Sequence, residues 1–414
     1  MKNFSLTIEE KRTFLFWLFV AFLIVYKCID DPLGRTVADN YLEGARRWLS
    51  GENIYYGARG FLYLPEFAFL YSFLSPLPLW LSEAVGRLLQ LWILVFGLFS
   101  FSRFIAKPRE KSFFPLITLV VFPICFSSIR NGQTNIAILG LMLLTVVALS
   151  KRHWNAAALL MTLGLVFKPT FIVFYLLAGA LHRPMYWRLA AGALLAFLIP
   201  VLFEGLNYVV QQHINFLVNL QEAVQLGVQK ADWASFFGIL PQLTGYFVPV
   251  EIQMAVRLVL APLVLFLVWL AGRRYGAGMS AYYLYALAAC YLMLFNPRNE
   301  NNDYAILSAA IGFWLAASVH RYQSRVLLYF SISMLVGILA AWEVSSRLTS
   351  GMDAWVSPLI ATIFTFFLIV RLLSGRDEEF PRTVESSVDR WVILLGRRPG
   401  AEALARKAAN LTPL

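Results

Sequence analysis

The sequence predicts an all-α polytopic membrane protein. Of its 414 residues, 59% are hydrophobic and only 14% are charged, whereas soluble domains carry about 45–50% apolar and about 25% charged residues. Apolar runs long enough to cross a bilayer recur along the whole chain, and the connections between them alternate in basic charge. A soluble protein of this composition would have too few polar groups to cover its surface, so we expect one membrane domain.

About twelve segments qualify as transmembrane helices, because a helix needs about 20 apolar residues to cross and somewhat fewer if its ends are anchored. They are 12–29, 84–102, 113–128, 135–150, 154–167, 170–182, 188–204, 252–272, 277–295, 304–319, 326–342 and 354–372. The first run lacks a small-residue cleavage site and is interpreted as an uncleaved helix. We expect a membrane domain over 1–375 and a partly amphipathic cytoplasmic tail over 376–414.

The Lys/Arg content of the connections predicts the orientation. If the N-terminus is cytoplasmic, the connections that share its side are "SRFIAKPREKS", "SKRHW", "HRPMYWR", "AGRRYG" and "HRYQSR", each with at least two basic residues. Those on the other side mostly carry one, apart from the long first loop. Both termini are therefore expected in the cytoplasm of a multi-pass protein of the cell's inner (plasma) membrane. The net charge of +11 is then mainly a topology signal, and no soluble basic module for nucleic acid is present.

The first outer loop, 30–83, is the longest and most polar connection. Residues 38–50 have helical spacing, with Tyr41, Ala45 and Trp48 on one face, which predicts an amphipathic helix on the membrane surface. The next stretch, "PEFAFLYSFLSPLPLW", is apolar but contains three prolines, and is expected to form a short half-inserted helix and a turn. Residues 205–251 are expected to form a second long outer loop.

Three aspartates in the first outer loop are candidates for a catalytic base. Asp30 and Asp31 follow the first span directly, where a solvated loop charge is the simpler interpretation. Asp39 opens the amphipathic helix at the membrane surface. An acid at that position is also a good helix N-cap, so a structural role stays open for it.

The stretch "LGLVFKPTFIVFY" places one lysine and one proline between two apolar runs. Pro169 removes a backbone donor and breaks the helix, and such a break is tolerated in a membrane only where backbone groups are buried in protein or meet water. Lys168 either extends to the interface or is a functional cation. Together the two residues favour a polar cavity that opens outward.

Two further outer connections are dense in hydrogen-bonding side chains. "RNGQTN" supplies Arg130, Asn131, Gln133 and Asn135, and "NPRNENNDYAIL" supplies Arg298, Asn299, Glu300, Asn301, Asn302 and Asp303. Amides and carboxylates together offer the donors and acceptors that sugar hydroxyls need. Tyr41 and Tyr63 of the first loop are aromatic candidates for contact with the sugar or the acceptor.

These patterns favour group transfer from a membrane-soluble donor that leaves as a phosphate. The candidate phosphate-binding cations are Lys168, Arg298 and Arg130. No nucleotide-binding loop is recognisable, and the connections expected in the cytoplasm are short. If the leaving group carries one phosphate rather than a pyrophosphate, positive charge suffices without a divalent metal, and we then expect neither a metal nor a cofactor.

The ordered motifs resemble the polytopic GT-C glycosyltransferases, and within them glycosyltransferase family 87, the bacterial polyprenyl-phosphate-mannose-dependent type. The matching pieces are "DNYLEGARRWLSGENIYY", "FLYLPEFAFLYSFLSPLP", "NGQTNIAILGLMLL", "LGLVFKPTFIVF" and, more weakly, "NPRNENNDYAIL". The resemblance implies a helical GT-C-like bundle with an extracytoplasmic active site. It also implies a polyprenyl-phosphate sugar donor, with mannose as the expected sugar, and a lipid or glycan acceptor.

The resemblance further implies an inverting reaction with an aspartate base in the first outer loop, and Asp39 is the nearest match. The chain departs from the family pattern in two places. The acid more often precedes the tyrosine by about one helical turn, where this chain has Val37, so Asp31 and Asp30 remain alternatives. The late outer loop often has a histidine, where this chain has Asn301, Asn302 and Asp303.

A transporter or lipid flippase is the alternative from another class of protein. Such proteins also have about twelve spans, broken helices and charges near the midplane. Alternating access requires a site that both sides can reach. The polar residues of this chain gather on one side only, which favours the transferase.

Overall fold

The structure is a computed structural model that describes residues 6–32, 34–55, 61–107, 110–230, 234–348 and 355–375. Within these ranges every regular element is a helix, which confirms the all-α prediction. The α-helices are α1 (Ile8–Asp30), α2 (Ala38–Leu49), α3 (Pro65–Ser72), α4 (Leu79–Ile105), α5 (Phe114–Asn131), α6 (Asn135–Ser150), α7 (Trp154–Phe167), α8 (Ile172–Leu181), α9 (Tyr186–Glu204), α10 (Leu206–Lys230), α11 (Phe236–Thr244), α12 (Val250–Arg274), α13 (Ala277–Phe295), α14 (Ser308–His320), α15 (Arg325–Leu348) and α16 (Val356–Ser374). Three 3₁₀ helices join them, η1 (Pro169–Phe171), η2 (Arg183–Met185) and η3 (Asn301–Leu307).

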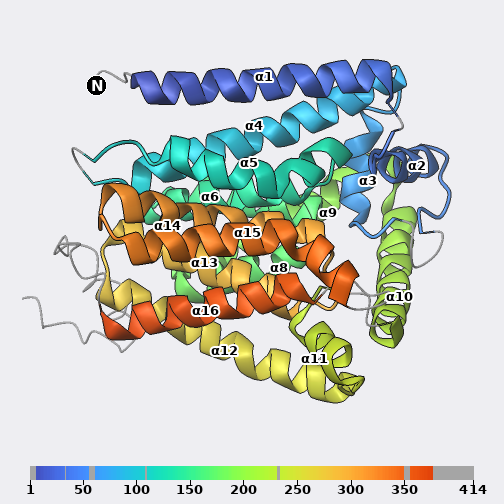
Figure 1. Cartoon of the computed structure of the whole chain (residues 1–414). Coiled ribbons are helices and arrows are strands. Elements are labelled where there is room, and N and C mark those ends of the chain that lie inside the picture. Colours follow the sequence, from blue (N-terminus) through green and yellow to red (C-terminus); the bar gives the residue numbers. More distant parts are fainter. Residues whose placement is uncertain are drawn as a thin grey trace, which may run out of the picture.

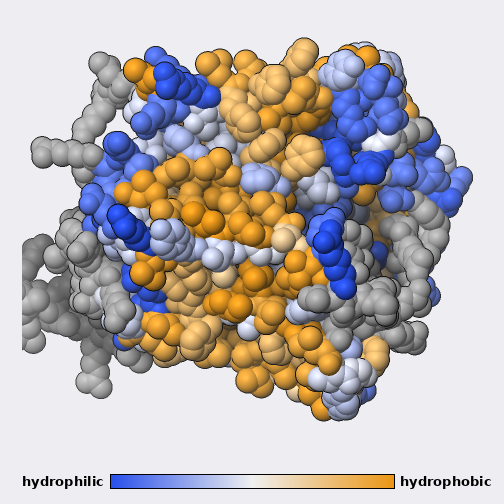
Figure 2. All heavy atoms as spheres, viewed as in Figure 1, coloured by the Kyte–Doolittle hydropathy of each residue, from blue (hydrophilic) through white to orange (hydrophobic). Residues whose placement is uncertain are grey.

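The long helices lie side by side in one bundle (Figure 1). In the described part of the chain, eight helices are long and apolar enough to cross a membrane, and four shorter apolar helices accompany them. These twelve coincide with the twelve segments predicted from the sequence. Figure 2 shows a hydrophobic band around the middle of the bundle with hydrophilic side chains at both ends. The chain is therefore a multi-pass membrane protein.

Four short or amphipathic helices, α2, α3, α10 and α11, lie at the end of the bundle opposite the N-terminus (Figure 1). The predicted helix over 38–50 is confirmed as α2, and Tyr41, Ala45 and Trp48 are buried on its inner face. The predicted helix after Leu64 is α3, which begins at Pro65. We call this end of the molecule the cap end.

The connection expected over 205–251 contains two helices that the sequence analysis did not predict, α10 and α11. α10 packs its polar side chains onto the first loop. Gln212 accepts a hydrogen bond from the backbone N–H of Ile54 at 3.1 Å, and Asn219 donates to the carbonyl of Phe61 at 3.1 Å. α10 therefore holds the first loop against the bundle.

α4 packs closely against α6. A Cβ atom added to Gly97 would lie 2.6 Å from the carbonyl oxygen of Gly140, so the two helices touch backbone to backbone. Any larger side chain at Gly97 would push them apart, because such an overlap cannot relax within a packed interior. The contact fixes α6, whose first residue is Asn135.

The predicted break at Lys168 is present. α7 ends at Phe167, and Lys168 takes an extended conformation (φ −156°, ψ 120°) before η1 starts at Pro169. A residue that precedes proline is disfavoured in the helical region, which explains this ending. The ring of Phe171 folds back onto Gly164, where a Cβ atom would meet it at 2.6 Å. The chain thus turns sharply and aims Lys168 into the bundle.

Candidate active site

A polar pocket of about 240 Å³ opens at the cap end. Its lining comes from α2, from the start of α6, from the α7–η1 break, from α10 and from the connection before η3. It includes seven of the residues to which the sequence analysis assigned a catalytic or binding role, namely Tyr41, Tyr63, Gln133, Asn135, Lys168, Arg298 and Asp303. Residues more than 250 positions apart in the chain therefore share one cavity. The cavity is smaller than typical binding sites for drug-sized ligands, which have volumes of roughly 300–1,000 Å³.

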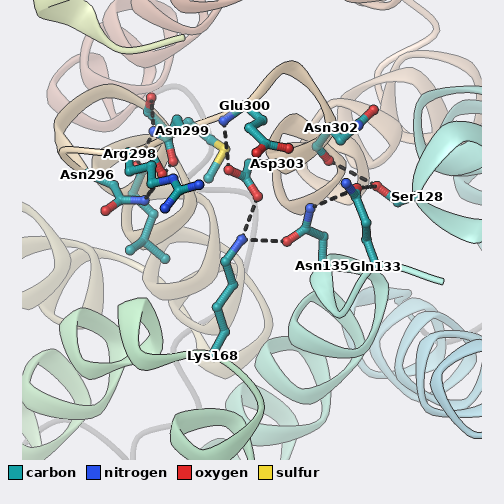
Figure 3. Close-up of polar contacts among 12 residues, drawn as sticks. Ser128, Gln133, Asn135, Lys168, Asn296, Arg298, Asn299, Glu300, Asn302 and Asp303 are labelled. Carbon is teal, nitrogen blue, oxygen red and sulfur yellow. Dashed lines mark hydrogen bonds and ion pairs between the residues drawn. The ribbon is translucent and has the colours of Figure 1, made fainter. Parts of the chain in front are cut away.

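Lys168 is the centre of the pocket's polar contacts (Figure 3). Its ammonium donates to Oδ1 of Asp303 at 2.5 Å and to Oδ1 of Asn135 at 2.7 Å. Burial lowers the pKa of Lys168, but the Asp303 carboxylate opposes that effect and the net shift is upward. Lys168 is therefore charged and paired, and two of its three N–H groups donate to side chains that the structure describes.

An amide chain behind Lys168 fixes its position (Figure 3). The side-chain amide of Asn135 donates to Oε1 of Gln133 at 3.4 Å, and the hydroxyl of Ser128 donates to the same oxygen at 3.0 Å. Ser128 also lies 3.1 Å from the carbonyl oxygen of Asn302. These contacts join α5, α6 and η3 behind Lys168.

The connection from Asn296 to Asp303 forms the opposite wall. Asn299 is fully buried and donates to the carbonyls of Leu292 and Met293, so it caps the end of α13 and does not line the pocket. The carboxylate of Glu300 accepts from the backbone of Asp303, and that of Asp303 accepts from the backbone of Glu300. Burial, followed by the charge of Asp303, raises the pKa of Glu300.

Two tyrosines of the first loop close the pocket beside α2. The hydroxyls of Tyr41 and Tyr63 are 2.9 Å apart, and their rings meet edge to face with centroids 5.0 Å apart. The ring of Phe67 stacks on Tyr63 with centroids 4.7 Å apart. Aromatic and hydroxyl groups are thus presented to the cavity together.

The "RNGQTN" connection is held by side chains of α4 that the sequence reading missed. Glu83 and Arg87 form a fully buried ion pair at 2.7 Å, and Arg87 also donates to the carbonyl of Arg130. The side chain of Arg130 lies 3.2 Å from that of its neighbour Asn131, and neither residue lines the pocket. Two opposite charges one helical turn apart within an apolar helix are the sequence feature from which this contact could have been predicted.

The structure leaves several other predicted residues outside the lining. Asp30, Asp31 and Asp39 are exposed, and none of them lines the pocket. Asp39 directly precedes Asn40 and Tyr41, which do line it. Asn301 and Asn302 do not line it either. The side chain of Asn301 accepts from Ser357 of α16 at 3.0 Å.

Four polar lining residues had no role assigned from the sequence, namely Asn40, Thr170, Asn296 and Glu300. Asn40 directly follows the candidate base, and Asn296 begins the polar stretch "NPRNENND". Their position next to predicted site residues is the sequence feature that could have identified them. Among the residues that the structure describes, no group of three or more His, Cys, Asp or Glu side chains is placed to hold a metal ion.

Comparison with protein-family models finds a match over much of the chain. The model of glycosyltransferase family 87 matches residues 61–297, which is more than half of the chain. The matched segment includes Lys168, Asn135 and Gln133, and it ends one residue before Arg298. No curated protein matches the chain significantly.

Proposed function

We propose, on the premise that the chain belongs to glycosyltransferase family 87 and is therefore a membrane glycosyltransferase, that its donor is a polyprenyl-phosphate sugar. Mannose is the first candidate sugar, and the acceptor is a lipid or glycan hydroxyl. The observation that carries the proposal is the pocket around Lys168, in which cations, amides and carboxylates gather at one end of a hydrophobic bundle. That setting suits a donor with a charged head and an apolar tail.

The reaction is a single inverting displacement. The acceptor oxygen attacks the anomeric carbon while the bond from that carbon to the phosphate oxygen breaks. The proton of the acceptor hydroxyl passes to a carboxylate base, and the polyprenyl phosphate leaves as an anion. Positive charge aimed at the leaving oxygen stabilises the transition state, which has oxocarbenium character as in glycoside hydrolysis.

The phosphate is assigned to Lys168 and Arg298, which line the same cavity. Lys168 has three N–H groups, two of which donate to Asp303 and Asn135, and a guanidinium binds phosphate oxygens in pairs. Arg130 stays a weaker candidate, because its side chain is outside the lining. The sugar hydroxyls are assigned to the amides and hydroxyls of the lining, from Asn135, Gln133, Tyr41 and Tyr63.

The base is assigned to Asp39. Its carboxylate is exposed, so an acceptor hydroxyl can reach it, and its neighbour Asn40 lines the pocket. Asp303 is the less suitable carboxylate, because Lys168 and the backbone of Glu300 already occupy its oxygens. Glu300 is the alternative within the lining, and Asp30 and Asp31, at the start of the first loop, are alternatives outside it.

The cap end is assigned to the extracytoplasmic side of the inner membrane, with both termini in the cytoplasm. The basic connections support this orientation. A test needs no change to the native cysteines, because Cys28, Cys125 and Cys290 are all buried. Ser50→Cys at the end of α2 and Ser374→Cys at the end of α16 form a matched pair of exposed positions.

In intact cells or right-side-out vesicles, an impermeant maleimide is expected to label Ser50→Cys and to leave Ser374→Cys unlabelled until detergent is added. The reason is that the reagent reaches only the outer face. The opposite pattern would place the pocket in the cytoplasm and remove the argument for a polyprenyl-phosphate donor.

Transfer is tested with the purified protein in proteoliposomes that contain polyprenyl-phosphate mannose labelled in the sugar, together with a panel of lipid and glycan acceptors. We expect labelled product from this donor and none from a nucleotide-linked mannose, because the pocket lies at the cap end of a membrane bundle, where a lipid-linked donor can reach it. Transfer from the nucleotide sugar alone would contradict the donor assignment. Movement of labelled lipid across the bilayer without any product would support the flippase alternative.

A further inference from the structure

A second cavity lies between α3, α7 and α9, with a volume of about 480 Å³. Small residues on the facing helices leave the space for it, among them Ala158, Ala191 and Gly192. Most of the other lining residues are large and apolar. We call it the α7–α9 groove. Its lining runs along α7 from Asn155 to Val166.

The length of the α7–α9 groove matches one hydrocarbon chain. Eleven steps along α7 at 1.5 Å per residue give about 16 Å. The hydrocarbon core of a bilayer is about 30 Å thick, so one leaflet contributes about 15 Å. The groove therefore has the length and the apolar lining for the chain of a lipid of one leaflet.

One buried carboxylate at the α3 end of the groove shows what kind of head group would fit. Glu66 lines the groove and is only 6% exposed. Its Oε1 atom lies 3.0 Å from Nε2 of His213. Its Oε2 atom has no hydrogen-bond partner among the residues that the structure describes, and a buried polar atom without a partner is costly.

The protonation of this pair makes Oε2 an acceptor. Nδ1 of His213 lies 2.8 Å from the carbonyl oxygen of Val209, and since a carbonyl only accepts, Nδ1 carries a hydrogen. The proton between the two side chains therefore lies on the line from Nε2 to Oε1, whichever group holds it. In both arrangements Oε2 has no proton and can only accept a hydrogen bond.

We propose that the α7–α9 groove binds the hydrocarbon chain of a lipid whose neutral head group carries hydroxyls, and that one hydroxyl donates to Oε2 of Glu66. A phosphate head would bring lone pairs and negative charge to an oxygen that can only accept, so the groove disfavours the donor lipid. Because Phe67 follows Glu66 and stacks on the pocket residue Tyr63, the head lies next to the pocket. The bound lipid is then the acceptor, which rests on the proposed function.

The ligand class is tested by photolabelling in phosphatidylcholine vesicles without any donor. The two probes are hexadecyl glucoside and hexadecyl phosphate, each with the same diazirine at the end of the chain, and labelled peptides are identified by mass spectrometry. We expect the glucoside to label α7 and α9 peptides at least about fivefold more than the phosphate. The reason is that a hydroxyl of the glucoside can donate a hydrogen bond to the Glu66 carboxylate, whereas the charged phosphate cannot. Equal labelling by both probes, or by a phosphatidylcholine probe, would overturn the proposal.

Two variants of α9 form a matched control. Ala191 lines the groove, whereas Ala193 is exposed and outside it. Ala191→Phe is expected to abolish the labelling of α7 by the glucoside and Ala193→Phe to leave it unchanged. Glu66→Gln adds a donor at the same place and is expected to reduce the preference for the glucoside over the phosphate. Unchanged labelling in Ala191→Phe would show that the probe binds elsewhere.

The readout separates this proposal from the proposed function, because labelling requires no transfer. If the glucoside labels the groove but no sugar is transferred from polyprenyl phosphates, the lipid site stands and the donor assignment fails. If transfer occurs and the groove is not labelled, the donor assignment stands and the lipid site fails.

Discussion

Asp39→Asn is expected to lower the turnover of sugar transfer by at least about a hundredfold while the fold persists, because an amide cannot take the proton of the attacking hydroxyl and general-base catalysis contributes about 10²–10⁴-fold. The side chain is exposed and lies in the first turn of α2. Loss of its charge there changes helix stability by only about 0.3–1 kcal/mol. The rate at saturating donor and acceptor, measured with a thermal unfolding curve in detergent, tests both statements.

The other exposed aspartates of the first loop provide the matched controls. Asp30→Asn and Asp31→Asn remove a charge of the same kind near the same surface, and neither is expected to reduce turnover more than a fewfold. Glu300→Gln tests the carboxylate within the lining. Full activity in Asp39→Asn together with a hundredfold loss in Glu300→Gln would move the base to Glu300.

Lys168→Met is expected to reduce transfer by about 10–150-fold, since a hydrogen bond to a charged group contributes roughly 1.5–3 kcal/mol. Both donor affinity and turnover are expected to fall, because the phosphate gains negative charge as it leaves. The substitution also leaves the carboxylate of Asp303 without its ion-pair partner, and the Asp303 side chain is only 7% exposed. Removing one partner of a buried pair costs roughly 3–5 kcal/mol, so a loss of stability is expected as well.

The double variant Lys168→Met/Asp303→Asn separates these two effects. It leaves no unpaired charge behind, so it is expected to recover most of the thermal stability of the native protein. Transfer is expected to stay at least about tenfold reduced, because the N–H that would bind the phosphate is still missing. Recovery of transfer together with stability would show that Lys168 only balances Asp303, and the phosphate would then be assigned to Arg298.

The sequence predicted the membrane spans and the chain break well, because both depend on local signals. Apolar length defines a span, and the Lys168–Pro169 pair ends a helix by backbone sterics. The helix α10 was missed since glutamine, asparagine and histidine lower its hydropathy. Its polar side chains bind the first loop, and that role becomes visible only when the loop is in place.

The candidate site was predicted in part. Lys168, Arg298 and Asn135 line the pocket as expected, because isolated polar residues at the ends of apolar helices turn toward water or toward one another. Which neighbours share the pocket depends on tertiary geometry. Asn301 contacts Ser357 while Asp303 contacts Lys168, because successive residues of a 3₁₀ helix point in different directions. Sequence spacing alone does not distinguish them.

The ion pair between Lys168 and Asp303 also constrains how the protein is made. The two residues are 135 positions apart, and synthesis proceeds at about 5–20 residues per second. The lysine therefore leaves the ribosome roughly 7–27 s before its partner does. During that interval the ammonium must stay in contact with water or with a helper protein, because an unpaired charge is costly in hydrocarbon. The pocket is thus completed late in biogenesis, and the order of insertion of the helices is part of what makes the site.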